Sequence, residues 1–284
     1  MMSKWLIALV CLGMIAYGSP ADLFCPDATS HGNVGLPEVQ GSKQWTAIAT
    51  PPGTADRLIH FTTYDPVNDQ IFFGGGNPDG YNTNNVTEVA VYDPTNDTWA
   101  SMAQMPEAVA WIDGVYYNGQ IFVAGGYTTS GGASGMMKIY DIGSDSWTTG
   151  ANVPNPTLAY VGVEYGGSIY IIGGYPASAT SVQRYDVAND SWTNATSLPL
   201  ADDMGGGVII DNVIYLVGGY NRGGGQVWTN IYEGVINPAD PDDITWTSGD
   251  ALPYANFLNG TGTCYGQIYM VGGFMNGSSA TNQV

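Results

Sequence analysis

Short apolar runs recur along the chain, and each one ends at a pair of glycines. The runs are QIFFGGGN at 70–77, QIFVAGGY at 120–127, SIYIIGGY at 168–175, VIYLVGGY at 213–220 and QIYMVGGF at 267–274. A short apolar run bounded by glycines predicts a β-strand that is buried on both faces. In the third copy, Gly166–Gly167 predicts a tight hairpin turn before the run, and a second hairpin is predicted to turn at Val187–Asp190. Each copy therefore predicts about four antiparallel strands.

The spacing of the glycine pairs predicts a repeat architecture. The pairs end at Gly76, Gly126, Gly174, Gly219 and Gly273, which gives steps of 50, 48, 45 and 54 residues. A period near 50 residues is typical of a repeated structural unit, and small sheets that are apolar on both faces are buried by packing around a ring. The pairs are Gly75 and Gly76, Gly125 and Gly126, Gly173 and Gly174, Gly218 and Gly219, and Gly272 and Gly273. In four copies a Tyr and then a Trp follow: Tyr92 and Trp99, Tyr140 and Trp147, Tyr185 and Trp192, and Tyr232 and Trp246.

Together, the glycine pairs, the Tyr and the Trp that follows resemble the kelch repeat over residues 42–284. The resemblance implies an all-β propeller of four-stranded antiparallel blades, in which the glycine pair ends the second strand and the Tyr and Trp pack between blades. It therefore implies structural roles for the glycine pairs and for the Tyr and Trp residues of each copy. We expect four full blades and an incomplete fifth, at about 53–106, 107–154, 155–199, 200–253 and 254–284. Residues 42–52, with Trp45 in the Trp position, are expected to be a ring-closing fourth strand. We expect the sequence to be the front part of a longer propeller. The alternative is a five-bladed ring with one defective blade.

The N-terminus predicts secretion. Lys4 precedes the apolar stretch WLIALVCLGMIAY at 5–17, which is short for a membrane span and typical of a signal peptide covering 1–21. Residues 22–41 form an N-terminal segment before the repeats. We expect an extracellular or periplasmic protein with no membrane insertion after cleavage. Cys25 and Cys264 then form a possible disulfide, and two unpaired thiols are the alternative.

The charge limits the partners. The chain has 25 acidic and 6 basic residues, a net charge of −19. Phosphate backbones and anionic membrane surfaces repel such a chain, so we do not expect nucleic acid as a partner. Cations or basic proteins fit the charge, as does an acidic surface with no dedicated ligand.

No cofactor or metal site is predicted. The recurring pairs Asp93/Asp97, Asp141/Asp145 and Asp186/Asp190 lack calcium-loop spacing, and Asp side chains capping turns explain them. A calcium ion between Asp240, Asp242 and Asp243 is the alternative in the fourth copy. Some kelch proteins resemble copper radical oxidases, but the only histidines here are His31 and His60. We therefore expect no catalytic residues within this sequence.

The candidate ligand-binding residues follow the glycine pairs. Tyr127, Tyr175, Tyr220 and Phe274 take equivalent positions in four copies, and Arg222 lies beside one of them. Aromatic residues among Asn, Ser and Gly suit carbohydrate or peptide binding, and packing against the next blade is the alternative. We expect a module that binds a protein or carbohydrate ligand rather than an enzyme. The alternative is a carbohydrate-active enzyme, either similar to sialic-acid mutarotases, for which Arg222 and Glu164 are the kind of residue required, or similar to galactose oxidase with its catalytic residues beyond Val284.

Overall fold

The computed structural model describes residues 6–7, 16–17, 48–53, 57–78, 84–176, 179–264, 266–275 and 279–280, and all regular structure among them is β-strand. Four antiparallel sheets have four strands each, in chain order from the inner to the outer strand. Blade 1 is β3 (Phe61–Asp65), β4 (Gln70–Gly74), β5 (Val89–Asp93) and β6 (Thr98–Met102). Blade 2 is β8 (Val115–Tyr117), β9 (Gln120–Ala124), β11 (Met137–Asp141) and β12 (Ser146–Gly150). The predicted all-β fold of four-stranded blades is confirmed.

The next two blades follow the same order. Blade 3 is β13 (Val161–Tyr165), β14 (Ser168–Ile172), β15 (Val182–Asp186) and β16 (Ser191–Ala195). Blade 4 is β17 (Gly206–Ile210), β18 (Val213–Val217), β21 (Ile231–Asn237) and β22 (Asp240–Ser248). In the fifth copy, β24 (Gly260–Cys264) pairs with β25 (Gln267–Val271), and β23 (Asn256–Phe257), β26 (Phe274–Met275) and β27 (Ser279–Ala280) form a separate sheet.

The remaining strands are short ladders. They are β7 (Val109–Ala110) with β10 (Tyr127–Thr128), β19 (Tyr220–Asn221) with β20 (Gln226–Val227), and β1 (Leu6–Ile7) with β2 (Ala16–Tyr17). Apart from the residues of β1 and β2, the predicted signal peptide lies outside the described residues, as do 22–47 and Cys25. The side chain of Cys264 is not described either, so the possible disulfide and the predicted domain boundaries stay predictions.

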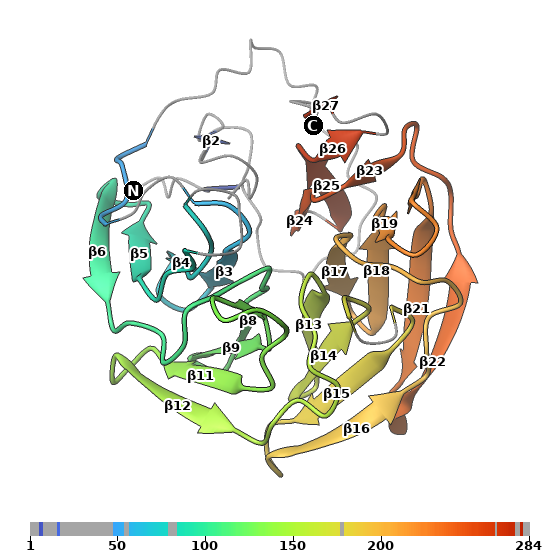
Figure 1. Ribbon diagram of the computed structural model, residues 1–284, viewed down its shortest axis with the longest axis horizontal. Coiled ribbons are helices and arrows are strands. Elements are labelled where there is room, and N and C mark those ends of the chain that lie inside the picture. Colours follow the sequence, from blue (N-terminus) through green and yellow to red (C-terminus); the bar gives the residue numbers. More distant parts are fainter. Residues whose placement is uncertain are drawn as a thin grey trace.

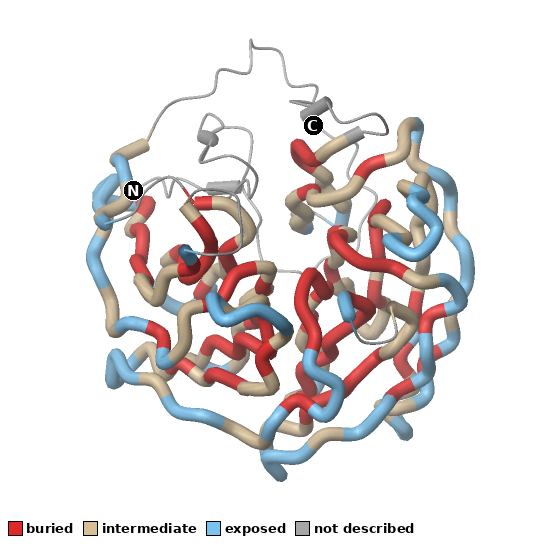
Figure 2. Tube along the Cα trace, viewed as in Figure 1, coloured by how far each residue is buried: buried red, intermediate tan, exposed pale blue. Residues whose placement is uncertain are grey.

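The blades succeed one another around a common centre (Figure 1). Their inner strands β3, β8, β13, β17 and β24 contact one another in that order. The middle strands are buried, as in β14, and the outer strands are mostly exposed at the rim (Figure 2). Neighbouring blades share their cores: the rings of Phe72 in blade 1 and Tyr140 in blade 2 lie 5.8 Å apart. Both faces of each middle strand are thus covered by packing between blades, as its apolar sequence requires.

A repeated polar lock joins the end of one outer strand to the next blade. In blade 2, the Tyr140 hydroxyl donates to Asp145 Oδ1 at 2.6 Å, and the Ala103 amide at the end of β6 donates to the same oxygen at 2.7 Å. Trp147 Nε1 donates back to the Ala103 carbonyl at 2.9 Å. Blade 3 repeats the lock with Tyr185, Asp190, Trp192 and Ala151. The second Asp of each recurring pair therefore binds the preceding blade as well as ending a turn.

Blade 1 carries the same lock toward the N-terminal side. The Ala49 amide donates to Asp97 Oδ1 at 3.1 Å, and Trp99 Nε1 donates to the Ala49 carbonyl at 2.7 Å. Ala49 thus takes the place that Ala103 takes for blade 2, four residues after a Trp in both cases. The contact agrees in register with a fourth strand that contains Trp45. That strand itself lies outside the described residues and stays a prediction.

Tyr232 packs against the core of blades 3 and 4, but it does not lie opposite the Trp of its blade as the other three Tyr residues do. Tyr92, Tyr140 and Tyr185 pair with the Trp of their own blade, but Trp246 pairs with Gly234, and Tyr232 lies opposite Ser248. The insertion lengthens the β21–β22 hairpin and moves Tyr232 two positions out of register. The Trp246 ring covers Gly234, where an added Cβ would come within 2.5 Å of it. A side chain at residue 234 would force the Trp246 ring to move, whereas the other three blades have Tyr opposite their Trp.

Candidate functional site

The loop that leads into each inner strand contains a left-handed residue that is not glycine. These residues are Ile59, Trp111, Ala159, Met204 and Leu258, with φ between 54° and 58°. This region is unfavourable for side chains, most of all for a β-branched residue such as Ile59. Such strain persists only where surrounding contacts enforce it, and it gathers at functional sites. The sequence carries no signal for it, because glycine does not mark the positions.

Backbone hydrogen bonds join these residues across the blades. The amide of Trp111 donates to Ile59 O at 2.7 Å, and that of Ala159 donates to Trp111 O at 2.8 Å. The amides of Met204 and Leu258 continue the series, to Ala159 O at 2.9 Å and to Met204 O at 2.7 Å. The five residues therefore form one connected arc on the side of the blades where the glycine pairs lie.

The residues that follow the glycine pairs lie beside this arc. Backbone pairing joins Tyr127 to Ala110, Tyr175 to Leu158, Tyr220 to Asp203 and Phe274 to Phe257. Each partner directly precedes a left-handed residue. The four predicted aromatic residues therefore occupy equivalent places at the same end of their blades. In blade 1 the equivalent residue is Asn77, which pairs with Leu58.

The glycine pairs make this close approach possible. Gly126 has a φ of 98°, and its amide donates to Thr157 O in the next loop at 2.9 Å. An added Cβ at Gly126 would overlap the side chain of Ile112. Glycine is thus needed both for the turn and for the contact with the next blade.

We call the surface formed by Trp111, Tyr127, Tyr175, Tyr220, Arg222, Phe257 and Phe274 the aromatic face. Tyr220 stacks on Phe257 at 5.5 Å and 28°, and Phe257 lies 5.8 Å from Phe274. Trp111, Tyr127, Tyr220 and Phe257 also pack against the buried residues Leu158, Ala159 and Met204. These aromatic residues therefore have a structural role as well. Sequence reasoning missed Trp111 and Phe257, which belong to the lead-in loops.

Tyr175 is the most exposed aromatic residue of this face. It is 44% exposed, and the Arg222 guanidinium lies 4.6 Å from the centre of its ring. Arg222 Nε donates to Asp203 Oδ2 at 3.1 Å, and the side chain of Arg222 is 39% exposed. The ion pair fixes the guanidinium through Nε. The terminal nitrogens of an arginine carry further donors, and these lie beside an open aromatic ring.

Arg222 differs from the other cations that the structure describes. Arg57, Lys138 and Arg184 have side chains that are 0%, 0% and 11% exposed, and they pair with Glu88, Glu107 and Asp242. Burial lowers the pKa of Lys138, and Glu107 opposes that shift. Among the described residues, Arg222 is therefore the cation most accessible to a ligand.

Two neighbouring acids hold the segment that carries Tyr220 and Arg222. Asp202 Oδ1 accepts the Tyr220 amide at 3.1 Å, and Asp203 holds Arg222. Burial raises the pKa of Asp202 well above its ordinary value, and the neighbouring Asp203 raises it further. Burial also raises the pKa of Asp203, while Arg222 lowers it. No local pattern in the sequence singles out these acids, because their burial depends on the packing of two blades.

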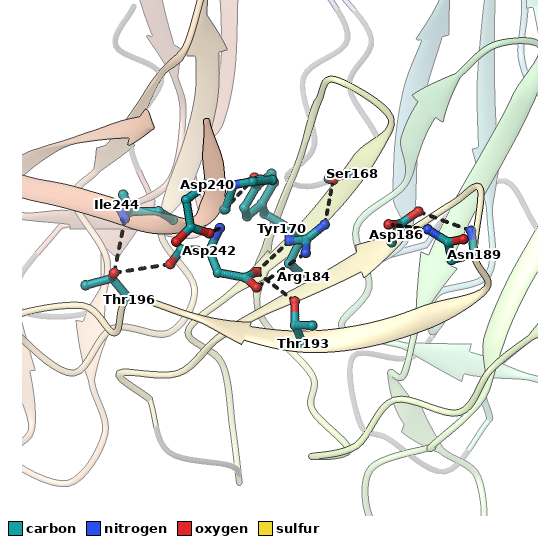
Figure 3. A network of polar contacts seen from close by, with 11 residues as sticks. Ser168, Tyr170, Arg184, Asp186, Asn189, Thr193, Thr196, Asp240, Asp242 and Ile244 are labelled. Atoms are coloured by element: carbon teal, nitrogen blue, oxygen red, sulfur yellow. Dashed lines mark hydrogen bonds and ion pairs between the residues drawn. The ribbon is translucent and has the colours of Figure 1, made fainter. Parts of the chain in front are cut away.

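The other candidates lie elsewhere. Glu164 Oε1 accepts the Gly167 amide at 2.8 Å and so caps the β13–β14 turn. Arg184 Nε donates to Asp242 Oδ1 at 2.6 Å, and Thr193 donates to the same oxygen (Figure 3). Asp242 thus ties the β21–β22 hairpin to blade 3. Within the described part of the chain, no group of three His, Cys, Asp or Glu side chains is arranged to hold a metal ion.

Replacing Asp242 with alanine should lower the free energy of unfolding by about 2 kcal/mol, because Arg184 would lose its charged hydrogen-bond partner. Calcium should not stabilise the unchanged protein, since Arg184 already occupies the Asp242 carboxylate. Urea unfolding with and without calcium measures both effects, and Asp243→Ala serves as the neighbouring control. A calcium-dependent gain in the unchanged protein that Asp242→Ala removes would contradict this assignment.

Comparisons with known proteins agree with this architecture. Residues 156–199, which form blade 3, match the kelch motif family. The solved structure of YjhT superposes with a TM-score of 0.70 at 16% sequence identity, covering 85% of this chain and 84% of that chain. No curated protein sequence matches this one. At this identity, the structural match shows a shared fold. Among the residues described here, no helix is long and apolar enough to cross a membrane.

Proposed function

Because the chain is a kelch-repeat β-propeller, we propose that it is a binding module that holds a carbohydrate on its aromatic face. The observation that carries this proposal is the exposed ring of Tyr175 beside the fixed guanidinium of Arg222. A sugar ring has apolar C–H faces that pack on an aromatic ring, and hydroxyl groups that accept hydrogen bonds from arginine. Few polar groups among aromatic residues are typical of small-molecule sites.

The charge of the chain disfavours two classes of ligand, and its N-terminus indicates in which compartment the protein would bind. A net charge of −19 disfavours nucleic acid and anionic membranes as ligands. We propose secretion or export through the segment 1–21. Mass spectrometry of the protein recovered outside and inside its source cells tests this. A chain outside the cells that begins near residue 22 supports the proposal, and a chain that is found only inside the cells and retains residues 1–21 contradicts it.

Tyr175→Ala and Arg222→Ala should each weaken carbohydrate binding about tenfold or more, because each removes one of the two exposed groups proposed to contact the sugar. Thermal unfolding of Tyr175→Ala should change little, since its ring is half exposed. Val67→Ala is the matched control. Val67 is 77% exposed in the turn between β3 and β4, at the opposite end of β4 from the glycine pair.

A glycan array probed with the purified chain identifies the ligand, and calorimetric titration measures the variants. Binding that Tyr175→Ala and Arg222→Ala weaken, with Val67→Ala unchanged, supports the proposal. No bound glycan, or equal affinity in all four proteins, contradicts it. If NMR shows that the protein interconverts the anomers of the bound sugar, the protein is a mutarotase-like enzyme rather than a binding module.

A further inference from the structure

The carbonyl of the first glycine in each pair is capped by a side-chain donor in four of the five copies. The contacts are Arg57 Nη1 to Gly75 O at 3.2 Å, Lys138 Nζ to Gly125 O at 2.8 Å, Thr157 Oγ1 to Gly173 O at 3.5 Å, and Asn256 Nδ2 to Gly272 O at 2.8 Å. Arg57, Thr157 and Asn256 each lie two residues before the left-handed residue of their loop. In blade 4 this position holds Asp202, and the glycine is Gly218.

The carboxyl group of Asp202 is placed against the Gly218–Gly219 pair. An added Cβ at Gly219 would overlap Asp202 Oδ1, and the Tyr220 amide donates to this same oxygen. Asp202 is 8% exposed, so its carboxyl group lies largely out of contact with water. An ionised carboxylate only accepts hydrogen bonds, whereas a protonated one also donates. Asn256 Oδ1 takes the same place at Gly273, so Asp202 Oδ2 corresponds to the Asn256 Nδ2 that donates to Gly272 O. An ionised carboxylate would offer the Gly218 carbonyl no donor.

We propose that Asp202 is a neutral carboxylic acid that donates to the Gly218 carbonyl, and that its ionisation at higher pH loosens the segment carrying Tyr220 and Arg222. Asp202 then does in blade 4 what the amide of Asn256 does in the fifth copy. The consequence for the ligand rests on the proposed function, because Tyr220 and Arg222 belong to the aromatic face. The protonation of Asp202 does not depend on that function.

The surroundings of Asp202 favour the neutral form. The titratable or charged groups that face it are Asp203 on the same loop, Arg222 after β19 and Tyr232 on β21. Arg222 is bound to Asp203 rather than to Asp202. Blade 3 and β18 contribute apolar side chains at this place, among them Val161, Ile172 and Leu216. Burial and the charge of Asp203 both raise the pKa of Asp202, and the hydrogen bond from the Tyr220 amide, which lowers it, is the smallest of these effects.

The sign of the pH effect follows from this raised pKa. The unfolded chain releases the Asp202 proton near pH 4, while the folded chain keeps it until its higher pKa is reached. Between these two values the folded state binds more protons, so stability falls as pH rises. The side-chain amide introduced by the variant Asp202→Asn donates at every pH and has no such loss.

The test is thermal unfolding of the full chain between pH 4 and pH 8, for the unchanged protein, Asp202→Asn and Asp202→Ala. We compare the melting temperature of Asp202→Asn with that of the unchanged protein at each pH. The difference should grow by about 3 °C for each unit by which the pH rises between the unfolded and the folded pKa of Asp202. Asp202→Ala should lose the pH dependence but melt below Asp202→Asn, because it lacks the donor. Asn256→Asp should gain the pH dependence in the fifth copy.

Two results would overturn the proposal. One is a constant difference in melting temperature between the unchanged protein and Asp202→Asn across the range. The other is a lower melting temperature of Asp202→Asn at pH 7, which would show that the ionised carboxylate is the stabilising form. A separate titration with the best-binding glycan of the array tests the link to the ligand: affinity should fall with rising pH in the unchanged protein and not in Asp202→Asn.

Discussion

Glu107→Ala should lower the free energy of unfolding by about 3 kcal/mol, because it leaves the ammonium group of Lys138 buried without its counter-charge. Lys138 Nζ lies 3.1 Å from Glu107 Oε2, and the Lys138 side chain is 0% exposed. The Ser134 hydroxyl also donates to Glu107 Oε2 at 2.6 Å and loses this acceptor. Lys138 keeps its bond to Gly125 O, and Glu107 is partly solvated, so the value lies at the low end for a broken buried ion pair.

The matched variant is the double substitution Glu107→Ala with Lys138→Met. It removes the buried charge together with its partner, so it should be more stable than Glu107→Ala alone. The defect of Glu107→Ala should also shrink between pH 7 and pH 10. A buried lysine with a lowered pKa gains stability as pH rises, because the folded state then binds fewer protons than the unfolded state. Urea unfolding of the unchanged protein, Glu107→Ala, Lys138→Met and the double variant measures both effects. A double variant whose loss of stability equals the sum of the two single losses would contradict the pairing.

Trp147→Ala should cost about 3 kcal/mol, because it removes a large ring from the boundary between blades 1 and 2. The ring lies 5.0 Å from that of Tyr140 and packs against the shared core of the two blades. Trp147→Phe is the matched control: it keeps an aromatic ring and removes the Nε1 donor to Ala103 O, at an expected cost of about 1 kcal/mol. Equal losses for the two variants, measured by urea unfolding, would show that the ring itself contributes nothing at this boundary.

The repeat was predictable because its signals are local. A glycine pair after an apolar run, and a Trp seven residues after a Tyr, are visible in the sequence and correspond to β-strand ends and to paired residues of a hairpin. The strand partner of Tyr232 was not predictable in this way. A longer hairpin changes which residue lies opposite Trp246, and the order of residue types does not reveal that the partner is Gly234.

The aromatic face was predictable only in part. Tyr127, Tyr175, Tyr220 and Phe274 follow glycine pairs, so the repeat itself placed them at equivalent positions. Trp111 takes a left-handed conformation without a glycine to mark it, and contacts with neighbouring loops enforce this conformation. Asp202 looks like any loop acid in the sequence. Its burial arises between blades 3 and 4, which only the folded ring brings together.

Hydrogen exchange of the full chain, with and without the best-binding glycan of the array, tests the central claim most directly. We predict that the glycan slows amide exchange in the lead-in loops and in the segments after the glycine pairs, above all around Tyr175 and at 220–222. Exchange in the β3–β4 turn, at the opposite end of blade 1, should stay the same. Protection confined to the outer strands β6, β12 and β16, with none around Tyr175 or Arg222, would show that the ligand binds the rim and that the aromatic face is not the site.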